Sequence, residues 1–198
     1  RRAMELSVPE RPRLIYALVV RGQNVVLAEH TSLAGNFQQA TMLIMRRLEC
    51  TEEWRSYLYG EYAFHYIVDQ ATGLWFVCMA ERAMGRRLPF AFLGELRELF
   101  GRLYTTEEIQ AAIAYGMQAA CQEELKALLE KYNCSGSDRV TALIEKVQHI
   151  NDSLMESIDK ILERQERIEL LVGRSDGLAE AAGAFRREAR GPGPGRCG

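Results

Sequence analysis

The first two thirds of the chain contain short runs of apolar residues separated by turn-forming residues. Residues 13–22 and 23–32 are two such runs, joined by RGQN, and they predict a β-hairpin. Three more runs, WRSYLYGEY, AFHYIVDQ and LWFVCMAE, lie between residues 54 and 81. They are rich in aromatic and β-branched residues, which favour sheets, and DQATG between the last two is typical of a turn. This part of the chain therefore predicts five strands.

Apolar residues at helical spacing predict three helices around these strands. The first runs over FQQATMLIMRRLEC, residues 37–50, with Asn36 as its N-cap. The second begins near Pro89, a residue type that suits a first helical turn. The third runs from about Thr106 to Tyr132 and opens with TTEE, a capping-box signal. The order β-β-α-β-β-β-α-α predicts an α+β domain, an antiparallel sheet with helices packed on it.

A different pattern follows the short linker CSGSD, residues 134–138. Apolar residues there recur at alternating steps of three and four, which is the 3.5-residue period of a coiled coil. Such a seam keeps one stripe of a helix against partner helices. Counted outward from Arg164, its positions are Val140, Leu143, Val147, Ile150, Leu154, Ser157, Ile161, Ile168, Leu171, Ser175, Leu178, Ala182, Phe185 and Ala189.

Arg164 occupies the middle of this otherwise largely apolar seam. A buried guanidinium is costly without acceptors, so partner helices would supply them, and side-chain amide oxygens suit its planar set of donors. A polar layer of this kind fixes helix register and partner choice. The alternative is an amphipathic helix that folds back on its own domain, with the arginine reaching solvent along its methylene stem. The seam spans residues 140–189, which is long for a domain of this size to cover.

Composition narrows the remaining classes of function. The formal net charge of −2 argues against a general nucleic-acid binder. Five cysteines without a CxxC pair suit reduced thiols better than a disulfide scaffold or a zinc site. The sequence has no apolar run long enough to span a membrane and no phosphate-binding glycine loop. His65, Asp69 and Cys78 could form a nucleophile set, but their strand-like surroundings favour buried structural roles. We therefore expect no catalysis, no cofactor and no metal.

The segment LERQERIELL, which contains Arg164, resembles the arginine-class (R-type) SNARE motif. RLIYALVVRG, AGNF, YGEYAFHYIVDQ and RLPFAFLGELRELF resemble the vesicle-associated membrane protein 7 (synaptobrevin-like) branch of longin R-SNAREs. The likeness implies a longin (profilin-like) α+β domain, a five-stranded antiparallel sheet with helices on both faces, followed by a long SNARE coiled-coil helix. The expected boundaries are 12–122 for the longin domain, 123–137 for the helix end and linker, 138–190 for the R-SNARE motif and 191–198 for a disordered tail.

The resemblance also implies a function in fusion of vesicles with endosomes or lysosomes. The SNARE helix would join glutamine-class SNAREs of the syntaxin and SNAP types, with Arg164 in the central ionic layer and the other seam residues in the apolar layers. The longin domain would give autoinhibition by folding onto this helix, and sorting by binding adaptors. Its contact surface is expected at Ile44, Leu48, Tyr57 and Tyr59. The alternative is a longin adaptor module, or an inhibitory SNARE without a membrane anchor.

Three features near the C-terminus depart from the family pattern. The family continues into a transmembrane helix, which holds these proteins at the cytoplasmic face of vesicle, endosomal or lysosomal membranes, whereas this sequence ends in GPGPGRCG and would be cytosolic. Gly173, Gly177 and Gly183 each disfavour a helix by up to about 1 kcal/mol. Pro192 falls on the next seam position and stops the helix. Cys197 is expected to be a free thiol rather than a site of lipid attachment.

Overall fold

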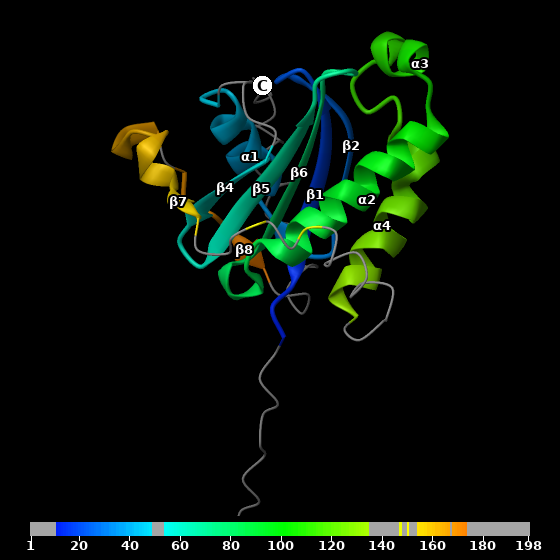
Figure 1. The fold of residues 1–198 in the computed structure, drawn as a ribbon. Coiled ribbons are helices and arrows are strands. Elements are labelled where there is room, and N and C mark those ends of the chain that lie inside the picture. The colour runs from blue at the N-terminus through cyan, green and yellow to red at the C-terminus, as the bar shows by residue number, and fades with distance from the viewer. Residues whose placement is uncertain are drawn as a thin grey trace, which may run out of the picture.

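A six-stranded sheet forms the centre of the computed structural model, which describes residues 11–48, 54–134, 147, 150, 154–166 and 168–173. The strand order is β2-β1-β6-β5-β4-β7 (Figure 1). The first five strands are antiparallel to their neighbours, and β7 runs parallel to β4. The bounds are β1 Leu14–Arg21, β2 Val25–Thr31, β4 Trp54–Tyr59, β5 Tyr62–Asp69, β6 Leu74–Glu81 and β7 Glu156–Ser157.

The five-stranded antiparallel sheet expected from the sequence is confirmed, with β7 as an addition at its edge. The strands β1 and β6 lie side by side in the middle and are buried on both faces, which explains their almost unbroken apolar sequence. Gly22, at φ +60°, closes the turn between β1 and β2. Asp69 closes the turn between β5 and β6 by accepting hydrogen bonds from the Ala71 amide (3.1 Å) and the Thr72 hydroxyl (2.9 Å).

Helices cover both faces of the sheet, as expected. Figure 1 shows α1 on one side and α2 with α4 on the other. Each side has its own buried apolar cluster. We call them the α1-side core, which includes Ile44 and Trp75, and the α2-side core, which includes Phe76 and Leu125. The helix bounds are α1 Phe37–Met45, the 3-10 turn η1 Arg82–Met84, α2 Arg87–Leu103, α3 Thr106–Ala111 and α4 Gln118–Asn133.

The single helix predicted from Thr106 to Tyr132 is wrong, because the chain breaks between α3 and α4. The capping box is present at the start of α3, where Thr105 and Glu108 bond each other's backbone amides. After α3 the loop follows the free edge of β2. The amide of Tyr115, which has φ +59°, donates to Val26 O at 2.7 Å, and the amide of Met117 donates to Leu27 O at 3.3 Å. These bonds pair two carbonyl groups of the edge strand β2. A continuous helix over the same residues would leave these carbonyl groups without this partner.

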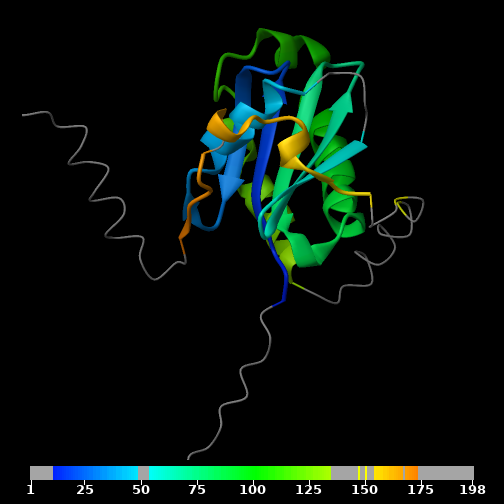
Figure 2. The same ribbon diagram turned by 90° about the vertical axis from the view of Figure 1, so that its left-hand side faces the viewer.

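The described part of residues 138–190 differs from the expected long helix. Residues 154–166 and 168–173, which we call the wrapped segment, lie against the sheet and α1 (Figure 2). A heptad stripe is buried in a helix only when partner helices cover it. In the single chain, an extended backbone with short turns lets apolar residues of this segment, chiefly Ile158 and Leu162, pack against the domain. The elements are β7, the 3-10 turns η2 Ile158–Lys160 and η3 Arg164–Glu166, and β8 Val172–Gly173, which pairs with β3 Ala34–Gly35.

Candidate functional site

The heptad region contacts both faces of the sheet around the edge strand β4. Val147 and Ile150 belong to the α2-side core, and the Arg87 Nε donates to Ile150 O at 3.3 Å. Farther along, β7 adds to β4 in parallel, with Tyr57 opposite Glu156 and Leu58 opposite Ser157. From there the wrapped segment continues over the α1 side (Figure 2). The edge of the sheet is therefore covered by the segment that the sequence identifies as a coiled-coil helix.

Two residues of the wrapped segment are buried in the α1-side core. Ile158 is 2% exposed and Leu162 is 3% exposed. The same cluster contains Ile44, Leu48 and Tyr57, with Tyr59 packed against it. The residues expected to form a longin contact surface thus lie together around the chain's own wrapped segment. Full burial of one Ile or Leu side chain contributes about 1.5–3 kcal/mol, so this pair is a large share of the contact.

Hydrogen bonds from side chains of the domain hold the backbone of the wrapped segment. The Tyr59 hydroxyl donates to Ile168 O. The Asn36 Nδ2 donates to Glu169 O at 2.7 Å, and its Oδ1 accepts from the Leu171 amide at 2.8 Å. Asn36 is the N-cap residue of α1, as predicted, but its side chain makes no capping hydrogen bond there. Its amide group has instead the complementary donor and acceptor that an extended backbone needs.

A close approach of backbones lies next to this asparagine. Ala34 pairs with Gly173 and Gly35 with Val172 in the short β3–β8 ladder. A Cβ atom at Gly35 would overlap the Leu171 carbonyl oxygen and the Phe37 ring, so only glycine fits without displacement. The sequence AGN therefore combines a position without a side chain and an amide that binds backbone.

Charged groups surround the apolar contact without entering it. Arg47, two residues after the end of α1, pairs with Glu166, and Arg55 Nη1 lies 3.6 Å from Glu156 Oε1. Burial raises the pKa of the Tyr57 hydroxyl, with Arg55 opposing the shift and Glu156 adding to it. The ion pairs are partly open to solvent, which limits the contribution of each to about 0–1 kcal/mol. The apolar pair and the backbone hydrogen bonds carry more of the contact.

The seam residues do not share one environment in this structure. Leu154 is 64% exposed and Leu171 is 54% exposed, and Arg164 and Ser157 are exposed as well. Ile161 and Ile168 are half-buried against the α1-side core. Seven seam positions and the tail lie outside the described residues, as do four residues singled out near the C-terminus. They are Val140, Leu143, Ser175, Leu178, Ala182, Phe185, Ala189, residues 191–198, Gly177, Gly183, Pro192 and Cys197.

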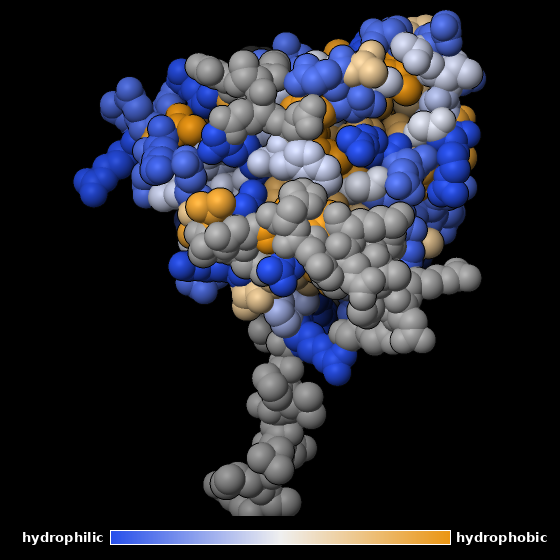
Figure 3. Space-filling model, viewed as in Figure 1, coloured by the Kyte–Doolittle hydropathy of each residue, from blue (hydrophilic) through white to orange (hydrophobic). Residues whose placement is uncertain are grey.

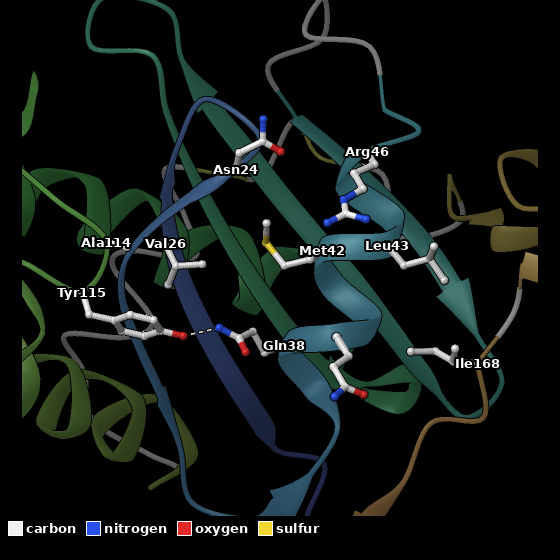
Figure 4. Close-up of a pocket in the computed structure, with 10 residues that line it drawn as sticks. Asn24, Val26, Gln38, Met42, Leu43, Arg46, Ala114, Tyr115 and Ile168 are labelled. Carbon is white, nitrogen blue, oxygen red and sulfur yellow. Dashed lines mark hydrogen bonds between the residues drawn. The ribbon is translucent and has the colours of Figure 1, made fainter.

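An open hollow lies between α1 and the edge of β2 (Figure 4). Met42 and Val26 give it an apolar floor, and Ile168 of the wrapped segment stands at one side. Gln38 donates a hydrogen bond to the Tyr115 hydroxyl across its mouth. On the face drawn in Figure 3, apolar residues form separate patches among hydrophilic ones. The hollow adjoins the wrapped segment but contains no group of chemically reactive side chains among the residues that line it.

The residues considered for catalysis have structural surroundings. His65 and Cys78 are paired across β5 and β6, and both are fully buried. The His65 Nδ1 lies 2.8 Å from the Ser56 hydroxyl, to which Arg86 Nε donates at 3.0 Å. Burial raises the pKa of the Cys78 thiol, which keeps it protonated and a poor nucleophile. The Asp69 carboxylate accepts the hydrogen bonds from Ala71 and Thr72 that close the β5–β6 turn.

Other chemistry can be stated for the described residues alone. They include no group of three or more His, Cys, Asp or Glu side chains placed to bind a metal ion. The three cysteines among them, Cys78, Cys121 and Cys134, are free thiols. No helix in the described ranges is both long enough and apolar enough to cross a membrane.

Three residues of the contact were missed by reasoning from sequence. The local sequence around Asn36 predicts only a helix cap, because the backbone groups that its side chain binds lie more than 130 residues away. Ile158 and Leu162 lie off the heptad seam, among charged residues assigned to a solvated helix face. The signal available in the sequence was the presence of these two apolar side chains on a helix face that is otherwise charged. It indicates a second contact for the same segment.

Comparisons with known protein families match two separate regions of the chain. Residues 27–125 match Longin, described as a regulated-SNARE-like domain, and residues 139–191 match Synaptobrevin. Vesicle-associated membrane protein 7B of Dictyostelium discoideum is 35% identical over 179 residues, covering 89% of this chain and 67% of the relative. Vesicle-associated membrane protein 711 of Arabidopsis thaliana is 34% identical, with 89% and 80% covered. Vesicle-associated membrane protein 7 of Rattus norvegicus is 29% identical, with 89% and 79% covered.

The two matched regions correspond to the two parts of the molecule. The Longin match covers most of the sheet and its helices, and the Synaptobrevin match includes the wrapped segment and Arg164. Both are families of SNARE proteins rather than of enzymes. The chain therefore belongs to the longin-domain R-SNARE family, with vesicle-associated membrane protein 7 proteins among its relatives.

Proposed function

We propose that this chain is an R-SNARE in membrane fusion at vesicles, endosomes or lysosomes, and that the structure is its closed state. The observation that carries the fusion function is the heptad seam centred on Arg164, within the region that matches Synaptobrevin. In a four-helix bundle with glutamine-class SNAREs, Arg164 would meet amide oxygens from three partner helices. The remaining seam residues would form the apolar layers on either side.

The closed state follows from competition for one segment. The backbone that pairs with β3 and β4 as short strands cannot at the same time be a helix in a bundle. The longin domain therefore inhibits assembly by the free energy of its contacts with the wrapped segment. Release of the segment would uncover the edge of β4 and the surface around Ile44, Leu48 and Tyr57. Sorting adaptors would bind the longin domain there or nearby.

The less favoured function is a longin adaptor module, in which the C-terminal segment only covers the domain. The Synaptobrevin match over residues 139–191 speaks against it, because a covering segment needs no heptad seam of that length. The two functions differ in what they require of partners. An R-SNARE needs glutamine-class helices, and an adaptor does not.

Complex assembly tests the proposal directly. The full chain is mixed with soluble helices of a syntaxin and of SNAP-type SNAREs, and formation of an SDS-resistant four-helix complex is measured. Arg164→Asp should weaken this complex by about 3–5 kcal/mol, because it replaces a buried cation facing acceptors by an anion facing the same acceptors. Lys160→Asp, a similar charge change at an exposed position beside the seam, is the matched control and should have a much smaller effect.

The control for folding is the circular dichroism of the free variants, which should equal that of the wild type, since Arg164 is exposed in the closed state. Absence of any complex with every syntaxin set would contradict the R-SNARE function. Equal weakening by the two substitutions would contradict the ionic-layer role of Arg164 while leaving the fusion function in place.

A further inference from the structure

Ile158 and Leu162 are the most deeply buried residues of the wrapped segment, and neither lies on the heptad seam. The seam passes through Ser157 and Ile161, the residues that precede them. Leu154 and Leu171, by contrast, are seam residues that remain more than half exposed against the domain. Within the wrapped segment, the closed structure therefore buries off-seam apolar side chains more deeply than those on the seam, whereas the upstream seam residues Val147 and Ile150 are buried in the α2-side core.

Helical geometry places these two sets on different faces. Successive residues of an α-helix are about 100° apart, so Leu162 lies about 100° round the helix from the seam residue Ile161 and farther still from Arg164. In a bundle built on the seam, Leu162 would be on the outer surface, and Ile158 would lie beside the seam. Neighbouring Asp159, Lys160 and Glu163 have the polar character expected of that outer surface.

We infer that Ile158 and Leu162 form a second interaction face of the SNARE segment, whose partner is the longin domain of the same chain. This inference rests on the proposed R-SNARE function. The off-seam pair, Ile158 and Leu162, binds the α1-side core in the closed state and has no layer to fill in the bundle. Leu154 and Leu171 serve the bundle and contribute little to closure. Ile161 and Ile168, half-buried here and on the seam, serve both states.

The division explains why Ile158 and Leu162 occur among charged residues, on a helix face where a solvated helix needs no apolar side chain. A segment that used its seam for both contacts could not be altered in one without the other. With separate faces, the stability of the closed state depends on Ile158 and Leu162, which do not lie in the layers of the bundle. Closure and assembly can then be changed independently by substitution.

Two substitutions of identical chemistry test this separation. Leu162→Glu and Leu154→Glu each replace leucine by glutamate, which has a similar helix propensity. Amide hydrogen exchange of the full chain reports closure at residues 156–170, and exchange in β1 and β6 reports folding of the domain. Leu162→Glu should raise exchange at 156–170 at least about tenfold, because it removes a buried side chain from the α1-side core. Leu154→Glu should leave this exchange within about threefold of the wild type. Leu162→Ala serves as a milder variant if exchange in β1 and β6 also rises.

The same proteins are then mixed with the glutamine-class helices. Leu162→Glu should assemble faster than the wild type and give a complex of unchanged thermal stability. Leu154→Glu should give a less stable complex, because it places a charge in an apolar layer. Unchanged exchange in Leu162→Glu and Leu162→Ala would overturn the inference, as would a Leu162→Glu complex as unstable as that of Leu154→Glu. If the wild type forms no complex but Leu162→Glu still raises exchange, the R-SNARE function fails and the assignment of Leu162 to the longin contact stands.

Discussion

Asn36 shows how one side chain can take a role that its local sequence does not reveal. Before a helix, asparagine usually accepts hydrogen bonds from the first-turn amides. Here its amide group binds the backbone of residues 169 and 171 instead. Asn133 at the end of α4 binds Leu14 in the same way, with its Oδ1 accepting at 2.7 Å and its Nδ2 donating at 2.8 Å. Two asparagines thus fix extended backbone. Asn133 binds β1 inside the domain, and Asn36 binds the wrapped segment.

These two asparagines give a matched pair of substitutions. Asn36→Asp keeps the shape and the acceptor for Leu171, but it loses the donor to Glu169 O and sets a carboxylate against that carbonyl. The closed state should weaken by about 1–3 kcal/mol. Exchange of the amides in residues 168–173 should rise about tenfold or more in Asn36→Asp, with β1 unaffected.

Asn133→Asp is the control with the same chemical change. It should raise exchange in β1 or lower the melting temperature of the domain without acting selectively on residues 168–173. A selective effect on the wrapped segment from Asn133→Asp, or none from Asn36→Asp, would refute the role given to Asn36.

At the level of elements, the sequence pattern predicted those helices and strands that have a local signal. Five strands, helices packed on the sheet and the capping box at Thr105 follow from apolar runs between turn residues, helical spacing and a local signal, whereas helices on both faces were implied by the family resemblance. The break between α3 and α4 was not predictable in this way, because the loop is set by hydrogen bonds from Tyr115 and Met117 to a distant strand. The wrapped segment is harder still. Its heptad period encodes a helix that partners stabilise, and the conformation without partners depends on the surface that the longin domain offers.

The segment should therefore change secondary structure when partners bind. We expect residues 156–166 of the full chain to show extended or turn-like carbon chemical shifts alone, and helical shifts after addition of glutamine-class helices. Residues of α3 should keep their helical shifts throughout and serve as the internal control. Helical shifts at 156–166 in the free chain would show that the closed conformation is not the one populated in solution.

Considered as a whole, the molecule protects both edges of its sheet with segments that lie outside it. The loop at Tyr115 bonds to the edge of β2, and β7 covers the edge of β4. Open strand edges can pair with other chains. The proposed release of the wrapped segment for assembly would therefore also expose the edge of β4. Val147 and Ile150 on one face and the off-seam pair on the other make this cover two-sided. Opening must therefore break apolar contacts on both faces of one sheet.

The balance of forces in this cover leads to a prediction about salt. Arg47–Glu166 and Arg55–Glu156 join domain and segment at partly exposed positions, with side-chain accessibilities of 53% and 23% in the first pair and 33% and 37% in the second. Raising NaCl from about 0.1 M to about 1 M shortens the Debye length from about 10 Å to about 3 Å. Because two such pairs at the middle of the range of about 0–1 kcal/mol contribute about 1 kcal/mol together, we expect exchange at residues 156–170 to rise no more than about fivefold, below the effect of Leu162→Glu. A rise of tenfold or more in the wild type would mean that the ion pairs, rather than Ile158, Leu162 and the Asn36 bonds, hold the segment closed.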